Sequence, residues 1–118
     1  MKLSYEGIGQ WAATFACGEV EEGEIVKVSA NGTVAACGAG DDFCGMVLSV
    51  SRGGDACAVA LGGMVTAGYT VPEEGAAPAV GWSGLSADGE GGVQADAEGS
   101  AYLVVDVDTT AKTVTFVL

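Results

Sequence analysis

Apolar and polar residues alternate along most of this chain, which is the pattern of half-buried β-strands. The last segment is the clearest case, because Val114, Phe116 and Leu118 are separated by Thr115 and Val117. Alternation places the first three side chains on one face, and we expect that face to be core. No stretch has a sustained 3.6-residue period, so little or no helix is predicted. The predicted strands cover residues 11–17, 24–30, 33–37, 43–51, 56–61, 64–70, 80–87, 93–97, 101–107 and 113–118.

The sequence also contains a weak internal repeat with an offset of 57 positions. Residues 29–61 align without a gap on residues 86–118, and the apolar positions keep their alternation. In this alignment the pair Asn31-Gly32 falls on Asp88-Gly89. A long period with only two copies indicates a duplicated half-domain and not a solenoid.

We therefore predict an all-β fold, a small β-barrel or β-sandwich made of two pseudo-repeated halves at about 23–61 and 81–118. Two such halves, related by a pseudo-twofold axis, would form one small closed sheet. The 118 residues are expected to form a single β domain. Within it, residues 1–18 are assigned to an N-terminal arm, and residues 71–78, which hold both prolines, to the seam between the halves.

The composition agrees with many short strands joined by tight turns. The chain has sixteen valines and twenty glycines. Valine packs well on a pleated surface, and glycine supplies the positive φ that tight turns require. Between the strands at 24–30 and 33–37, Asn31-Gly32 predicts a two-residue hairpin turn in which both residues have positive φ.

The formal charge of −12 limits the classes of partner. Nucleic acids and anionic membranes are bound by clustered Lys and Arg, and the chain has only four such residues, so neither is expected as a partner. The acidity favours solubility or a basic partner. No stretch approaches the length of a membrane span, and polar residues from Ser4 onward interrupt the signal-like start at 1–3. We expect a protein made in the cytoplasm, with reduced cysteines.

The side chains offer little catalytic chemistry. The absence of histidine removes Ser-His-Asp and Cys-His catalysis and His-ligated zinc. The four cysteines contain no C-x-x-C pair, and Cys44 and Cys57 align with the small apolar residues Ala101 and Val114. We interpret the cysteines as core residues, and a disulfide, a metal site or a nucleophile stays an alternative. We predict no enzyme activity and no cofactor.

Carboxylates are the remaining candidates for ligand binding. Asp88, Glu90, Asp96 and Glu98 could offer oxygen ligands to Ca²⁺, but their spacing does not fit an EF-hand loop. Every acidic group lies in or beside a predicted turn, where carboxylates are usually solvated. No metal site is assigned, and a ligand or Ca²⁺ bound through these acidic loops is the alternative function.

Four apolar side chains near the N-terminus are the candidate interface residues. They lie outside the aligned repeat, and aromatic residues are common anchors of protein interfaces. The alternative is that they pack against the β domain of their own chain. These residues are Tyr5, Ile8, Trp11 and Phe15.

Three segments together resemble the small capsid decoration (cement or head-stabilisation) proteins of tailed phages and prophages. The resemblance extends from about Leu3 to Leu118 and is a pattern of Gly, Val and turns. The segments are Tyr5-Glu6-Gly7 with Trp11-Ala12-Ala13-Thr14-Phe15, then Val20-x-x-Gly23-Glu24-Ile25-Val26-Lys27-Val28 with Asn31-Gly32, and Cys44-Gly45-Met46-Val47-Leu48 with 55–65.

This resemblance implies a non-enzymatic structural protein of the virion, which binds the outer surface of the phage head and stabilises the shell. It implies the major capsid protein as partner, and a homo-oligomer such as a trimer. The stretch from Gly54-Asp55 to Gly62-Gly63 also resembles biotinyl and lipoyl domains. Gly62-Gly63 stands where that family carries its cofactor lysine, so only its fold is kept as an alternative.

Overall fold

A computed structural model describes residues 11–73 and 75–118, and these residues form an all-β fold without helix. Each predicted strand is present, with ends that shift by up to two residues. The strands are β1 (Trp11–Cys17), β2 (Ile25–Ala30), β3 (Thr33–Ala36), β4 (Gly45–Val50), β5 (Ala56–Gly62), β6 (Met64–Gly68), β7 (Gly81–Ala87), β8 (Val93–Ala95), β9 (Ser100–Asp108) and β10 (Thr113–Val117). The predicted fold class is confirmed.

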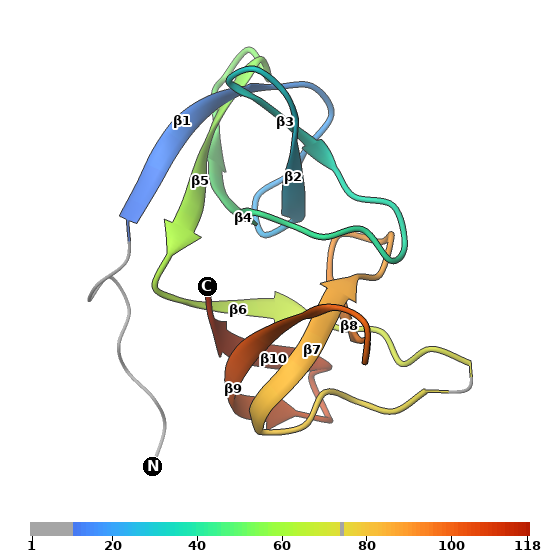
Figure 1. The fold of residues 1–118 in the computed structure, drawn as a ribbon. Coiled ribbons are helices and arrows are strands. Elements are labelled where there is room, and N and C mark those ends of the chain that lie inside the picture. Colours follow the sequence, from blue (N-terminus) through green and yellow to red (C-terminus); the bar gives the residue numbers. More distant parts are fainter. Residues whose placement is uncertain (1–10, 74) are drawn as a thin grey trace.

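The strands form two five-stranded sheets, one from each half of the chain (Figure 1). The first is a closed barrel with the order β1-β3-β2-β4-β5, and the second has the order β6-β10-β9-β7-β8. When β1 is matched with β6 and each of β2 to β5 with the strand five places later, the second sheet has the same neighbouring strands, read in the opposite direction around the sheet, and its β6/β8 contact is a single bridge. The chain is thus two copies of one five-stranded unit, and the closed sheet belongs to the first copy alone.

The first strand of each unit is related by a different offset from β2, β4 and β5, which keep the offset of 57. Phe15 pairs with Cys57 and Ala67 pairs with Val114, so Phe15 and Ala67 are equivalent at an offset of 67 − 15 = 52. The offset differs from 57 because the connection after β6 (69–80, twelve residues) is five residues longer than the connection after β1 (18–24, seven residues). An ungapped alignment therefore cannot extend the repeat to β1.

The boundary between the two units lies at Gly63, between β5 and β6. Residues 71–78, assigned to the seam from the sequence, instead connect β6 to β7 inside the second unit. Residues 11–17 of the assigned arm are strand β1 of the closed barrel, and residues 1–10 lie outside the described part of the chain. The position of the prolines reflects the inserted five residues and not the junction of the copies.

The units differ in how the sheet closes. In the first, β1 and β3 pair in parallel through Ala16↔Thr33 and Cys17↔Val34. In the second, the equivalent contact is a single parallel bridge, Tyr69↔Val93. The second sheet is therefore the more open of the two, and its interior is continuous with the interface between the units.

A shared hydrophobic core joins the units into one body. Its buried residues include Ile25 and Phe43 from the first unit and Val104 and Phe116 from the second. Phe43 stacks on Tyr102 at 5.0 Å between ring centroids and meets Phe116 edge-on at 5.8 Å. Phe116 is fully buried, which confirms the predicted core face of the last strand. Such aromatic pairs add about 0.5–1.5 kcal/mol each beyond their buried area.

Backbone hydrogen bonds also cross between the units. Ala87 in β7 donates its N–H to Asp41 O at 2.9 Å and accepts the N–H of Gly40 at 2.8 Å. Ile25 at the start of β2 donates its N–H to Gly91 O at 2.9 Å. The loop 37–44 thus meets the end of β7 at Ala87, and Asp41 is held in turn by Lys27 Nζ at 2.6 Å.

The Asn31-Gly32 hairpin is present, but its turn differs from the prediction. Gly32 has φ 62°, whereas Asn31 is not among the described residues with positive φ. The register between β2 and β3 shifts between Val28 and Ala30. A bulge beside the turn therefore replaces the two-residue turn in which both residues have positive φ.

Candidate protein-interaction faces

Of the four predicted interface residues, the structure describes Trp11 and Phe15, and Tyr5 and Ile8 lie outside the described residues. Trp11 begins β1 and is 60% exposed. Its indole lies directly over Gly62, where any Cβ would overlap the ring. Phe15, four residues along the same strand, is half-buried and packs against the core of the first barrel. Trp11 is thus available on the surface, whereas Phe15 is mainly a core residue.

A second exposed tryptophan, which the sequence analysis did not single out, lies on the second unit. Trp82 in β7 is 75% exposed, the most exposed large apolar side chain among the described residues. It pairs with Leu103 of β9, which pairs with Val117 of β10. Directly paired residues share a face of the sheet. We call Trp82, Leu103 and Val117 the open row.

The open row has an exact counterpart by register in the first unit. Ile25 pairs with Met46 and Met46 pairs with Ala60, each 57 positions before its equivalent. We call these three residues the covered row, because Ile25 is 1% exposed, Ala60 is fully buried and Met46 packs against the shared core. The second unit covers this row.

The open row is also free of charge. Strands β6, β7 and β10 contain no Asp, Glu, Lys or Arg, and the two acids of β9 lie at its far end. Val80, two residues before Trp82, is 67% exposed and extends the apolar surface. In a chain of net charge −12, this is a distinct uncharged face.

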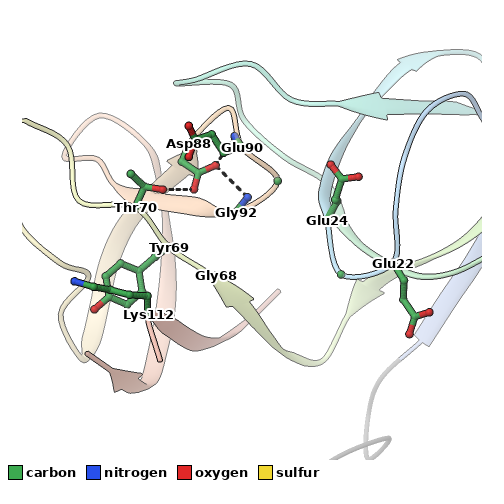
Figure 2. A pocket seen from close by; sticks show the side chains of 11 residues that line it. Glu22, Glu24, Gly68, Tyr69, Thr70, Asp88, Glu90, Gly92 and Lys112 are labelled. Atoms are coloured by element: carbon green, nitrogen blue, oxygen red, sulfur yellow. Dashed lines mark hydrogen bonds between the residues drawn. The ribbon is translucent and has the colours of Figure 1, made fainter. Parts of the chain in front are cut away.

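An open groove of about 350 Å³ lies between the two units (Figure 2). Glu22 and Glu24 line it on the first unit, and Asp88 and Glu90 line it on the second. Lys112 lies over the Tyr69 ring, with Nζ 5.8 Å from the ring centroid. The Lys112 backbone has φ 58° and accepts the Tyr69 N–H at 3.0 Å, so this side of the groove is a rigid turn.

Both oxygens of the Asp88 carboxylate at this groove accept hydrogen bonds from groups of the protein itself. Oδ1 accepts the N–H of Glu90 at 2.7 Å and of Gly92 at 3.0 Å, and Oδ2 accepts the Thr70 hydroxyl at 2.8 Å (Figure 2). These bonds fix the 88–92 turn where the second sheet closes. Asp88 therefore serves as a structural residue here, not as a free ligand.

Asp96, another of the predicted calcium ligands, is used in a similar way. Asp96 Oδ1 accepts the Glu98 N–H at 2.9 Å. A hydrogen bond from Ser86 is the main cause that lowers the pKa of Asp96. Asp88 and Asp96 lie on either side of β8. Within residues 11–73 and 75–118, no three His, Cys, Asp or Glu side chains form a group that could hold a metal.

The four cysteines are all free thiols in this structure. Cys57 is 2% exposed, and Cys44 and Cys17 pack against the same core of the first barrel. Burial, and then a hydrogen bond with Cys17, raises the pKa of Cys57 to about 11. Burial likewise raises the pKa of Cys37 to about 11. Thiols with a raised pKa are poor nucleophiles near neutral pH.

Among the described residues, no helix is long and apolar enough to cross a membrane. The geometry therefore offers two exposed tryptophan faces, one on each unit, and an acidic groove whose best-placed carboxylate is already engaged. Comparison of the sequence with protein-family models and with curated proteins finds no match.

Proposed function

We propose that this protein is a non-enzymatic structural protein that decorates the head of a tailed phage or prophage and stabilises its shell. The observation that carries the proposal is Trp11, exposed at the start of β1 on a rigid barrel. A large aromatic side chain that is held on the surface by a glycine, Gly62, is the kind of residue that anchors protein interfaces. The sequence resemblance to capsid decoration proteins supports the major capsid protein as the partner.

The fused architecture is consistent with a stabilising role. Two units share one core and are also joined by backbone hydrogen bonds, so a force on one unit is transmitted to the other. A protein that cross-links neighbouring capsid subunits needs this kind of rigidity, because any flexibility would be an entropic cost of binding.

The test uses heads of the phage or prophage that encodes the chain, assembled with and without the protein. We expect bound protein on the heads and a higher disassembly temperature with it. Trp11→Ser should weaken head binding by about 30-fold or more, as for an interface anchor. Thr14→Ala, an exposed change on the same strand, is the matched control and should bind as wild type. Heads that lack the protein, or that are equally stable without it, contradict the proposal.

The alternative is a small β domain that binds a ligand or Ca²⁺ through its acidic loops, and the acidic groove between the units is the observation in its favour. A melting temperature that rises with Ca²⁺ and falls with EDTA supports this alternative. A melting temperature indifferent to both counts against it.

A further inference from the structure

We infer that the open row is the docking face for a second copy of this chain. The inference starts from the duplication. The equivalent covered row is buried by a unit of this same fold, whereas the open row has no covering unit within the described part of the chain. One face of a duplicated unit is thus partnered inside the chain, and the same face of the other unit is left for a neighbour.

The contrast is largest at one position of the repeat. Ile25 is 1% exposed, and its equivalent Trp82 is 75% exposed. A tryptophan can bury about 150–250 Å² on association, so leaving it in water forgoes a large apolar gain. The half-buried Leu103 and Val117 continue the face, and Met64, which is also half-buried and pairs with Val117, extends it to the next strand. The result is an apolar surface with a tryptophan at one end, which suits a sheet-on-sheet contact.

The net charge of the chain indicates that the partner at the open row is a second copy. Each copy carries −12, so two copies repel wherever their acidic loops approach. The open row is uncharged, and it lets two copies meet without bringing like charges into contact. A basic partner would instead be expected at the acidic loops, such as the groove lined by Glu22 and Glu90.

Because the same face is offered by both copies, the simplest arrangement is isologous, with Trp82 of each copy against the open row of the other. This inference does not depend on the proposed function. Trp11 belongs to β1 and Trp82 to β7, and these strands lie in different units (Figure 1), so the head-binding residue and the self-association residue are separate.

The first test is the mass in solution, measured by sedimentation velocity over about three decades of concentration. We expect wild type to pass from monomer to a closed oligomer as concentration rises. Trp82→Ser should weaken this association by about 30-fold or more, whereas Trp11→Ser, the matched tryptophan on the other unit, should associate as wild type. Added salt should strengthen association, because it screens the repulsion between two acidic copies.

A second measurement leaves the open row intact. Trp11→Phe makes Trp82 the sole tryptophan, since the chain has two. Acrylamide quenching of Trp82 fluorescence should then fall as the protein associates. In Trp82→Phe, quenching of Trp11 should not change with concentration. A wild-type protein that stays monomeric throughout, a Trp82→Ser variant that associates normally, or Trp82 quenching that ignores concentration overturns the inference. Each of these outcomes leaves the head-binding test unaffected.

Discussion

The two units share one fold but differ in what surrounds each of them. The first is a closed barrel, and its outer row packs against the second unit, with Ile25 and Ala60 buried and Met46 half-buried. The second closes by a single bridge, and its equivalent row is exposed at Trp82 and half-buried at Leu103 and Val117. The register among β2, β4 and β5 is kept in β7, β9 and β10, whereas the burial of Ile25 is lost at its equivalent Trp82. The difference shows that the environment of a strand, and not its place in the fold, decided which side chain each position carries.

The interiors of the units differ in the same way. The first barrel has a core of its own, built around Val26, Val47 and Val59. The second has none to itself, because its inner residues form one cluster with Ile25 and Phe43 of the first. The second unit is therefore expected to depend on the first for its stability.

The largest effect should come from the shared core. Phe116→Ala should lower the free energy of unfolding by about 3–5 kcal/mol, because it removes a fully buried ring that also contacts Phe43. Its equivalent in the first barrel is Val59, and Val59→Ala should cost about 2 kcal/mol, since fewer buried atoms are lost. Urea denaturation measures both. A midpoint for Phe116→Ala within error of wild type would show that this face of the last strand is not core.

A smaller effect is expected at the equivalent turns. Asp88→Ala should cost about 1–2 kcal/mol, because it releases two backbone N–H groups and the Thr70 hydroxyl. Asn31, its counterpart, has an exposed side chain, and Asn31→Ala should stay within about 0.5 kcal/mol of wild type. Thermal melts of the two variants give the comparison. Asp88→Asn keeps the Oδ1 acceptor and should fall between them. Equal losses at the two turns would contradict the role given to Asp88.

The smallest effect is a pH dependence of stability at the loop 37–44, which is hydrogen-bonded to Ala87 of the second unit. The hydrogen bond with Lys27, and then the Gly38 N–H, lowers the pKa of Asp41 below its usual 3.8. The same pair raises the pKa of Lys27 above 10.5. A lowered acid pKa stabilises the fold above the unfolded value, and this stability is lost as pH falls through the folded pKa. For Lys27 the stability is present below 10.5 and is lost as pH rises through the folded pKa.

Between about pH 4 and pH 10, Asp41→Asn should therefore melt slightly below wild type, and the difference should shrink as pH falls below about 4. Lys27→Met should also melt slightly below wild type. This difference should likewise shrink in acid, because protonation of Asp41 removes the ion pair in wild type as well. Melting curves across this range provide the measurement. A difference that grows in acid would rule out the ion pair as its source.

Much of this fold could be predicted from the sequence. Alternation located every strand, including Thr113–Val117, because each half-buried strand keeps one apolar face. The repeat was visible over β2, β4 and β5 because their cross-strand register is the same in β7, β9 and β10. Between β2 and β3 the register differs by four residues from that between β7 and β8, with Val28↔Val34 in the first unit and Leu85↔Ala95 in the second. The repeat was missed at β1 and β6, where the longer connection 69–80 changes the offset from 57 to 52.

The interaction faces were less accessible to sequence reasoning. Trp11 stood out as an aromatic residue outside the aligned segments, and it is exposed. Trp82 lies within a predicted strand, where an aromatic residue is ordinarily core, and only the arrangement of the two units shows that its face is uncovered. Phe15 looked equivalent to Trp11 in sequence, but it is half-buried against the core of the first barrel, whereas Trp11 at the start of the strand is exposed. Which face of a strand is covered depends on tertiary packing, which alternation alone does not specify.

The most direct test compares Ile25→Ala with Trp82→Ala, the same position in the two copies, by urea denaturation at a concentration where wild type is monomeric. The buried Ile25 should cost about 2–4 kcal/mol, and the exposed Trp82 should stay within about 0.5 kcal/mol of wild type. Equal costs, or a larger loss at Trp82, would contradict the claim that one copy of this face is covered within the chain and the other is left open.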